Sequence, residues 1–518
     1  MTKFSDDSGV HTTTDNTARF GVTRVLATIL CVLGIPVMVL VLVRVLFGAP
    51  ITAYRPLISD EVTYWHQAFT FSVAGFHGGY YTLDEVTNPS GVTPFGPHGP
   101  GFPVLYGLAG KVVGWHRYSV VMLHLIALAI AGGVWASVSR VSVSRLFLTG
   151  LMLVTFWHVL FWAPTGMQEP LHHAGAIVMA AFFAAALGPS ARPWTTVSGW
   201  IVLAALSLIR PSWVLLMPLW AFATTRSARW PTMLGMLAVS AACAAAALVA
   251  FSRIVAPYSS GVFSLLAMST SPGLAAIADS VSSNLARLSQ SDQFVFIEIL
   301  HRYQYVACVL VASAATVICA WKEPSALRKG PAAHFLVAAA AMAGEAAAML
   351  LLYEFTSFAE HRVLSAFLLF GLLLCVAAPG RIGPLLVVCL ILSNLASANV
   401  SLRTFEASRR DHFTEDTDAL RLSQAIDGKV AYRADLSRWC NTLLTSRFPT
   451  DLIAIPPGIG LSVLQNPERI VPRPRSRYLL LDESALAAFR SPLNVDPIVA
   501  LPYGTLYVNR DADCDGQR

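Results

Sequence analysis

The chain has 518 residues, of which 55% are hydrophobic and only 13% are charged. A soluble globular protein carries about twice that charged fraction, so the composition excludes an ordinary soluble enzyme and indicates a protein with lipid as its solvent. The formal charge is +6, but residues 1–399 hold 21 Lys and Arg against 15 Asp and Glu, whereas residues 400–518 hold 15 of each. The positive excess lies in the apolar part, which favours orientation by basic loops over nucleic-acid binding.

The first apolar run, residues 25–47, is too long for the core of a cleavable signal peptide and long enough to span a bilayer. Further apolar runs predict about eleven membrane-spanning helices. The fifth and sixth are short and meet at Arg210-Pro211, where proline breaks a helix, so they could be two halves of one broken or re-entrant unit. The predicted spans are 25–47, 117–138, 146–163, 170–187, 196–209, 211–224, 232–252, 303–321, 331–353, 362–379 and 382–399.

Lysine and arginine collect in every second loop between these spans, which marks those loops as cytoplasmic. The opposite loops are mostly longer but poorer in basic residues. This pattern predicts a multi-pass protein of the cell (inner) membrane, with a cytoplasmic tail at 1–24 and a C-terminus outside the cytoplasm. The basic loops contain Lys3, Arg19 and Arg24; Arg140 and Arg145; Arg192; Arg226 and Arg229; Lys322, Arg328 and Lys329; and Arg381.

The pattern divides the chain into a membrane domain at 25–399 and a small soluble α/β domain at 400–518, on the outer side. Within the soluble domain, residues 419–426 are predicted as a helix, and 429–432, 478–481 and 505–508 as strands. The outer segments 48–116 and 253–302 are longer than ordinary connections, and such loops usually carry function. We found no internal repeat, G-x-G-x-x-G motif or Walker motif.

The eight cysteines show no metal-site spacing, and six of them lie in apolar helices, where cysteine acts as a small hydrophobic residue. Cys440 and Cys514 are the two in the soluble domain. They could pair if that domain faces an oxidising compartment. Nothing in the sequence fixes the distance between them.

Ionisable residues gather at the predicted outer ends of the spans. Charge in or near hydrocarbon is energetically costly, so a cluster on one side of the membrane indicates a functional site. Adjacent carboxylates with Tyr64 and Trp65 close behind suit acid/base work on a hydroxyl group. Two arginines suit a phosphate, because the guanidinium fork matches phosphate oxygens. The cluster comprises Asp60, Glu61, His98, Glu169, Arg210, Glu354, Glu360, His361 and Arg362.

Each of these residues also has a structural interpretation. Asp60-Glu61 could be a solvated helix start, and Glu169-Pro170 could be a helix start with proline in the first turn. Arg210 could reach the headgroups with its long side chain, and Arg362 could pair only with Glu354 or Glu360. A structural role is favoured for His98, His172, His173 and Glu345.

The order of these residues resembles the polyprenyl-phosphate-dependent GT-C glycosyltransferases, which include the protein O-mannosyltransferases and the bacterial aminoarabinose transferases. The similarity covers roughly residues 25–400. The family's acidic pair and tyrosine in the first outer loop are resembled by Asp60-Glu61-Val-Thr-Tyr64, and its basic residue before prolines by His98-Gly-Pro-Gly-Phe-Pro. Three later elements are resembled by Met167-Gln-Glu169-Pro, Ser207-Leu-Ile-Arg210-Pro and Glu360-His-Arg362-Val.

The resemblance implies that Asp60 is the base that deprotonates the acceptor hydroxyl, and that Glu61 and Glu169 support it or bind sugar and acceptor. Arg210 and Arg362 would neutralise the lipid-phosphate leaving group, with inversion at the anomeric carbon. Tyr64, His98 and Glu360 are further candidate substrate-binding residues. This chain has His98 where the family usually has lysine, and Val363 where it has tyrosine.

The leading hypothesis is a glycosyltransferase that moves a sugar from a polyprenyl-phosphate donor to an acceptor outside the cytoplasm, such as an envelope lipid, glycan or protein. Metal use varies in the family; the sequence offers no convincing ligand set and does not require a divalent metal. A transporter or flippase of lipid-linked sugars is the alternative from another class, supported by the broken helix and by Glu345 inside a span. A polysaccharide polymerase or ligase is a third.

Overall fold

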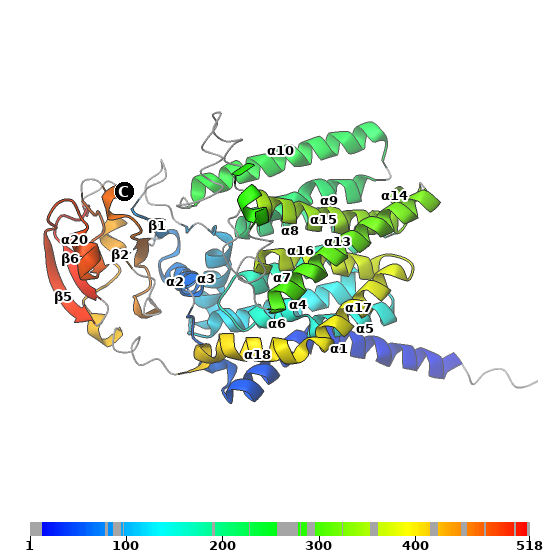
Figure 1. Cartoon of the computed structure of the whole chain (residues 1–518), viewed down its shortest axis with the longest axis horizontal. Helices are drawn as coiled ribbons and strands as arrows, with labels where there is room; N and C mark the ends of the chain where they lie inside the picture. Colours follow the sequence, from blue (N-terminus) through cyan, green and yellow to red (C-terminus); the bar gives the residue numbers. More distant parts are fainter. Residues whose placement is uncertain are drawn as a thin grey trace, which may run out of the picture.

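The structure is a computed structural model, and it describes residues 13–57, 59–77, 81–85, 95–96, 98–188, 192–226, 228–255, 278–279, 281–286, 296–323, 325–352, 361–414, 423–446, 453–470, 473–501 and 504–514. A long bundle of helices occupies one end of the molecule and a twisted sheet the other (Figure 1). The structure confirms the predicted fold class, a polytopic helical membrane protein with a small C-terminal α/β domain.

Each predicted span corresponds to a helix or to a broken helix. The bundle consists of α1 (Thr13–Phe47), α4 (Ser119–Val138), α5 (Val143–Thr155), α6 (Trp157–Trp162), α7 (Glu169–Leu187), α8 (Pro193–Ile209), η3 (Pro211–Leu215), α9 (Leu216–Thr225), α10 (Trp230–Ile254), α13 (Phe296–Lys322), α14 (Ala326–Lys329), α15 (Ala332–Leu352), α16 (His361–Ala377), α17 (Ile382–Ala396) and α18 (Ala398–Arg409).

Several of these helices are too short to cross a bilayer alone. Among the described residues, six helices are long and apolar enough to do so, and the bent pair α17–α18 makes a seventh if it counts as one span. The predicted third span is α5 followed by α6, and α8 ends where Pro211 starts the 3-10 helix η3. The eleven apolar segments therefore include short and broken helices.

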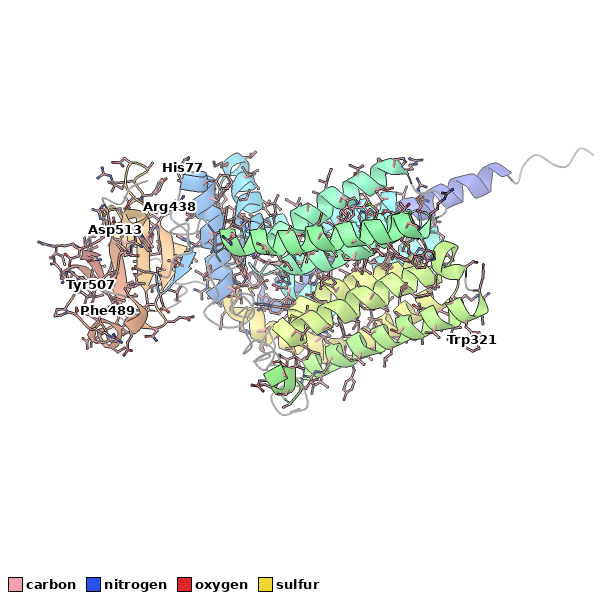
Figure 2. All side chains as sticks on the ribbon, turned by 90° about the horizontal axis from the view of Figure 1, so that it is seen from above. His77, Trp321, Arg438, Phe489, Tyr507 and Asp513 are labelled. Atoms are coloured by element: carbon pink, nitrogen blue, oxygen red, sulfur yellow. A yellow bond between two sulfur atoms is a disulfide. The ribbon has the colours of Figure 1, made fainter. Side chains whose placement is uncertain are left out.

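Basic side chains hold the helix ends together at the end of the bundle far from the sheet. Arg145 donates to the carbonyl oxygens of Ala377, the last residue of α16, and of Gly380 beyond it. Arg226 donates to the carbonyls of Ala186 and Leu187 at the end of α7. Such carbonyls have no partner within their own helix, and a cation there also complements the helix dipole. Trp321 lies at this end (Figure 2) and is 86% exposed, as suits an interfacial tryptophan.

The long loop between α1 and α4 forms a layer between the bundle and the sheet. It contains the short helices η1 (Ile51–Ala53) and η2 (Gly75–His77), together with α2 (Ser59–Ala74) and α3 (Gly101–Val113). Helix α2 is buried along most of its length, so it lies inside the protein rather than on its surface. Figure 1 shows α2 and α3 between the bundle and the strands.

The sheet has six strands in the order β1-β3-β2-β4-β6-β5. The first four run parallel, and β6 and β5 are antiparallel additions at one edge. The predicted strands at 478–481 and 505–508 correspond to β4 and β6, but 429–432 forms no strand, and the expected helix at 419–426 lies partly outside the described residues. The strands are β1 (Tyr81–Leu83), β2 (Thr442–Thr445), β3 (Gly460–Val463), β4 (Tyr478–Leu481), β5 (Val495–Leu501) and β6 (Gly504–Asn509).

One edge strand of this sheet, β1, comes from the long loop rather than from the C-terminal segment. The next two residues, Asp84 and Glu85, are buried and have positive φ angles. Asp84 accepts hydrogen bonds from the backbone N–H groups of Gln465 and Asn466, and Glu85 accepts one from Ser476. These bonds offset the cost of the left-handed backbone and attach the loop firmly to the sheet.

A disulfide joins Cys440, just before β2, to Cys514, after β6. The sequence left this pairing open. The bond closes the C-terminal segment on itself and joins cysteines with a sequence separation of 74. Chain entropy arguments predict that such a cross-link stabilises the folded domain.

Candidate active site

Four charged side chains from four separate elements meet at the end of the bundle that faces the sheet. Asp60 Oδ2 lies 2.8 Å from Arg362 Nη2. Glu169 Oε1 lies 3.0 Å from Arg210 Nη2 and 3.3 Å from Arg362 Nε. Arg362 therefore contacts both carboxylates, and Glu169 contacts both arginines. We call these four residues the charge cluster; the sequence predicted that they share one face of the membrane domain.

Helix ends explain why these residue types occupy these places. Asp60 and Glu169 lie in the first turns of α2 and α7, where the helix dipole favours a negative charge. Arg210 directly follows the last residue of α8, where the dipole favours a positive charge. Arg362 lies in the first turn of α16, where the dipole disfavours a cation, so its two carboxylate partners offset that cost.

The cluster balances two carboxylates against two guanidinium groups, which makes its burial tolerable. The side chain of Glu169 is only 2% exposed, and those of Arg210 and Arg362 are 13% and 15% exposed. Asp60 is 32% exposed, so its carboxylate is the member of the cluster most open to solvent. Glu169 Oε2 has no hydrogen-bond partner among the described residues. The cluster thus presents one accessible carboxylate beside two guanidinium groups.

His98 and Tyr64 stand beside the charge cluster. The ring of His98 meets that of Tyr64 edge to face, with 4.9 Å between centroids, and Tyr64 packs on Phe102. Burial lowers the pKa of His98 to about 4; Asp60 opposes this shift, while Arg362 and Arg210 add to it. This low pKa favours the neutral imidazole at pH 7, so His98 does not add a third cation to the charge cluster.

Two glycines let the His98 loop approach the broken end of α8. A Cβ on Gly101 would lie 2.8 Å from the backbone nitrogen of Ile209, and one on Gly99 would lie 2.8 Å from the carbonyl oxygen of Leu208. Gly99 also has φ +88°, which favours glycine. The loop therefore touches the residues directly before Arg210 through its own backbone.

Glu61 does not join the charge cluster, although it follows Asp60 in the chain. Its side chain is fully buried, and Oε2 accepts hydrogen bonds from His412 Nε2 and from the backbone N–H of Leu57. Its other oxygen accepts from the N–H of Gly166. The solvated-helix interpretation therefore fits neither acid, since Asp60 is ion-paired and Glu61 is enclosed. Glu169 does begin α7 with Pro170 in the first turn, so its structural and functional interpretations hold together.

The remaining predicted residues have other surroundings. Glu354 and Glu360 lie outside the described residues, as does the side chain of His361. His172 accepts a hydrogen bond from Trp213 Nε1, and His173 lies 2.7 Å from Ser365 Oγ, so both are buried and bonded between helices. Glu345 is buried in α15.

The sequence did not single out Arg409 and His412, which lie at the end of α18 and in η6 (Arg410–Phe413). Both are buried, at 2% exposure, even though they follow the last predicted span. One signal in the sequence was available: Phe405 and Arg409 are four residues apart, and both face inward from α18. Among the described residues, no group of three or more His, Cys, Asp or Glu is arranged to hold a metal ion.

No protein-family model matches the chain, and no curated protein matches it. Among solved structures, the chain is similar to ArnT from Cupriavidus metallidurans bound to undecaprenyl phosphate, with 12% identity and a TM-score of 0.37, over 98% of this chain and 100% of that chain. A TM-score this low carries no conclusion about the activity, the substrate or the residue roles of this chain.

Proposed function

We propose that this protein is a membrane glycosyltransferase that moves a sugar from a polyprenyl-phosphate donor to a hydroxyl-bearing acceptor outside the cytoplasm. One observation carries the proposal: a partly exposed carboxylate, Asp60, is paired with Arg362, and Glu169 contacts both Arg362 and Arg210, at one end of a membrane bundle. A base next to an anion-binding pair is the arrangement that a transfer with a phosphate leaving group needs.

In the proposed reaction, Asp60 accepts the proton of the acceptor hydroxyl as its oxygen attacks the anomeric carbon of the sugar. The bond from that carbon to the phosphate oxygen breaks, and the electron pair leaves with the lipid phosphate. Arg210 and Arg362 stabilise the charge on the leaving group through bidentate hydrogen bonds. Attack on the face opposite the phosphate inverts the anomeric carbon. Arg362 exchanges its contact with Asp60 for the phosphate, which frees Asp60 to act as a base.

The environment of the charge cluster fits a lipid-linked donor. The cluster lies at the end of an apolar bundle, so a polyprenyl chain can stay in the bilayer while its phosphate reaches the arginines. Glu169 holds both arginines through one oxygen and is itself deeply buried. Its role in the proposal is to keep the two guanidinium groups at the spacing that one phosphate requires. Tyr64 and His98 are proposed to bind the sugar, and no divalent metal is required.

The proposed orientation has two independent supports. Disulfides persist in oxidising compartments, so the Cys440–Cys514 bond suits a sheet that lies outside the cytoplasm. Basic residues such as Arg145 and Arg226 lie at the opposite end of the bundle, which suits the cytoplasmic side. In the proposed arrangement, the charge cluster opens toward the extracytoplasmic side of the cell membrane.

A transporter or flippase of lipid-linked sugars is the second candidate. The break between α8 and η3 at Arg210 favours it, because broken helices form substrate sites in many transporters. Reconstituted liposomes distinguish the two functions. Movement of a lipid-linked sugar without any new glycosidic bond supports transport, whereas a new bond supports transfer. A polysaccharide polymerase or ligase would make the same bond repeatedly, so product length separates it from a single transfer.

The first test of the proposal is the Asp60→Asn variant. A carboxylate base contributes about 10²–10⁴-fold to the rate, so we expect transfer to fall by that factor while the protein still inserts in the membrane. The matched control is Asp427→Asn, which removes an exposed carboxylate from a turn of the soluble domain and should leave the rate unchanged. The assay follows radiolabelled sugar from a polyprenyl-phosphate donor into envelope fractions. Full activity of Asp60→Asn would remove Asp60 from the mechanism.

A further inference from the structure

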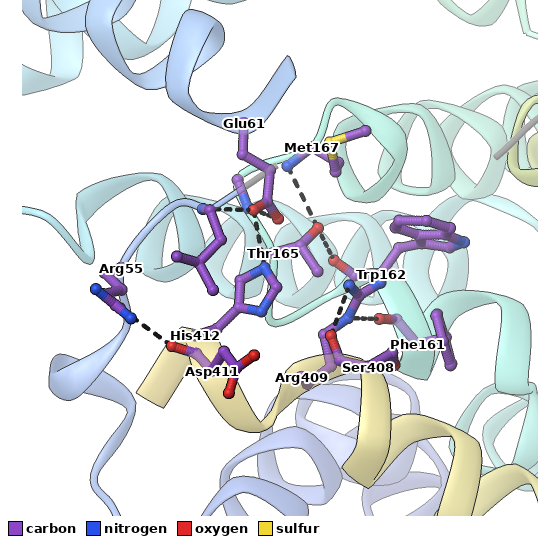
Figure 3. A network of polar contacts seen from close by, with 12 residues as sticks. Arg55, Glu61, Phe161, Trp162, Thr165, Met167, Ser408, Arg409, Asp411 and His412 are labelled. Atoms are coloured by element: carbon purple, nitrogen blue, oxygen red, sulfur yellow. Dashed lines mark hydrogen bonds and ion pairs between the residues drawn. The ribbon is translucent and has the colours of Figure 1, made fainter. Parts of the chain in front are cut away.

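The two neighbouring acids of α2 point to different parts of the protein. Asp60 meets Arg362 of α16, in the charge cluster. Glu61 meets His412, which is 351 residues later in the chain, with 2.9 Å between Glu61 Oε2 and His412 Nε2 (Figure 3). Successive residues of a helix point about 100° apart, so Asp60 and Glu61 bind partners on two different sides of the first turn of α2. The orientation of Asp60 therefore depends on how Glu61 is held.

Glu61 is held on both of its oxygens. Oε2 also accepts a hydrogen bond from the N–H of Leu57, at 3.0 Å, and Oε1 accepts one from the N–H of Gly166, at 3.2 Å. Gly166 belongs to the turn that leads into α7 and Glu169. A single enclosed carboxylate thus joins the start of α2, the turn before Glu169 and the segment that follows α18.

His412 is fixed by contacts of its own. Its carbonyl oxygen accepts a hydrogen bond from the N–H of Arg55, at 2.9 Å, and the ring of Tyr54 stacks on its imidazole at 5.9 Å. Arg55 Nε also donates to the carbonyl of Asp411 (Figure 3). A carboxylate only accepts hydrogen bonds, so His412 must carry its proton on Nε2. Residues 54–57 and 411–413 therefore run together just before α2 begins.

The charge on Glu61 is stabilised in place. Burial alone would raise the pKa of its carboxyl, but His412, Arg409 and the N–H of Leu57 together lower it to about 2. Arg409 is buried over the rings of Phe161 and Trp162, at 4.6 and 4.8 Å. Both oxygens of Glu61 are hydrogen-bonded and its side chain has no exposed surface, so an acceptor hydroxyl has no access to this carboxylate.

We propose that Glu61 and His412 form a positioning pair that aims Asp60 at the substrate. The proposal rests on the proposed function, in which Asp60 is the base. It specifies how Glu61 supports Asp60, through the contact with His412, and it assigns a function to η6, the segment that leads from the bundle to the soluble domain. In this proposal the orientation of Asp60 depends on His412, which lies 351 residues after Glu61 in the chain.

Two substitutions of His412 separate its hydrogen bond from its packing. His412→Gln places an amide N–H near the position of Nε2 but removes the ring that stacks on Tyr54. His412→Phe keeps a ring and removes the donor. A positioning role predicts that Gln retains most of the activity and that Phe lowers kcat by about 10²-fold, since a misplacement of about 1 Å can have that effect. A packing role predicts the reverse order.

Glu61→Gln removes the acceptor of the same hydrogen bond, so its kcat should fall as it does in His412→Phe. Glu406→Gln, at a more exposed ion pair, is the control.

The decisive measurement combines these substitutions with Asp60→Asn. If the pair acts through Asp60, adding His412→Phe to Asp60→Asn causes no further loss of kcat, and the KM for the polyprenyl-phosphate donor stays within about twofold in each single variant. A further loss in the double variant, or a normal kcat in both His412→Phe and Glu61→Gln, would overturn the proposal. If His412→Phe fails to accumulate, Glu61→Gln is combined with Asp60→Asn in the same way.

The result also separates this proposal from the proposed function. Full activity of Asp60→Asn means that the proposed base is wrong, whatever the other variants do. An inactive Asp60→Asn together with fully active His412→Phe and Glu61→Gln leaves the base in place and rejects only the positioning pair.

Discussion

At the scale of single residues, the ion pairs of the charge cluster must rearrange before a donor phosphate can bind the two arginines. Asp60 is paired with Arg362, and Glu169 with both arginines, so every member already has a partner of opposite charge. A phosphate group competes for the two guanidinium groups with charge-assisted hydrogen bonds. Donor binding and release of Asp60 would then be the same event. A base that becomes free only when the donor is bound protects the cluster from unproductive proton transfer.

This competition gives a prediction for Arg210. Replacing Arg210 by Gln removes a cation that contacts Glu169 but leaves the Asp60–Arg362 pair intact. A hydrogen bond to a charged group is worth about 1.5–3 kcal/mol, so binding of a polyprenyl phosphate should weaken by roughly 10- to 150-fold. The affinity is measured by inhibition of transfer with free polyprenyl phosphate. Arg403→Gln, which removes an exposed arginine of α18, should change nothing. Unchanged affinity of Arg210→Gln would exclude it from the phosphate site.

The sequence could predict the charge cluster but not the positioning pair. Glu169, Arg210 and Arg362 each lie next to the end of an apolar run, and Asp60 lies in the outer loop after the first run, so their shared face follows from the topology. Asp60 and Glu61 are equivalent in the sequence, because nothing there shows which side of a helix turn faces which partner. His412 lies in a segment of ordinary polar composition, and a contact over 351 residues leaves no local pattern.

At the scale of elements, proline and glycine place the site residues. Pro211 ends α8, so Arg210 leaves the helix with an extended backbone, at φ −147° and ψ 128°. Gly99 and Gly101 then allow the His98 loop to touch the end of α8. The sequence indicated this break correctly. It did not distinguish β2 and β3, because buried strands of four residues look like any short apolar run.

The close approach at Gly101 can be tested with one methyl group. Gly101→Ala places a Cβ 2.5–2.9 Å from atoms of Ile209, including two backbone atoms, so the loop or the end of α8 must shift. Overpacking of this kind costs about 1–3 kcal/mol. We expect a lower thermal midpoint in detergent and a higher KM for the donor. The control is Gly235→Ala, also in a helix, where an added Cβ meets nothing within 4 Å. Equal KM values for the two variants would show that the loop does not help to place Arg210.

At the scale of the whole molecule, the long loop, the sheet and the bundle form one connected structure. The loop provides strand β1, the acids Asp84 and Glu85 that bond to the sheet, and helix α2 with Asp60. The soluble domain is thus linked twice to α2, the helix that carries Asp60: once through strand β1 of the same loop, and once through His412, which contacts Glu61. The domain boundary near residue 400 remains a prediction of the sequence, but the sheet extends beyond it by taking β1 from the loop.

The proposed sidedness of this structure leads to a final prediction. If the sheet lies outside the cytoplasm, a membrane-impermeant phosphine will reduce the Cys440–Cys514 disulfide in intact cells, and an impermeant maleimide will then label the more accessible thiol, Cys514. The exposed Cys243 and Cys389 are replaced by Ala beforehand so that they do not contribute. Cysteine introduced by Arg381→Cys, at the far end of the bundle, should be labelled only after the membrane is permeabilised.

Two variants make the labelling experiment conclusive. Replacing Cys440 and Cys514 by Ser must abolish the signal from intact cells, which shows that it arises from the sheet. The opposite pattern, in which Arg381→Cys is labelled in intact cells and the disulfide only after permeabilisation, would invert the topology. The charge cluster would then face the cytoplasm, and acceptors outside it would be out of reach. Because the disulfide and the basic loops argue for the same orientation from unrelated physics, an inverted result would contradict both at once.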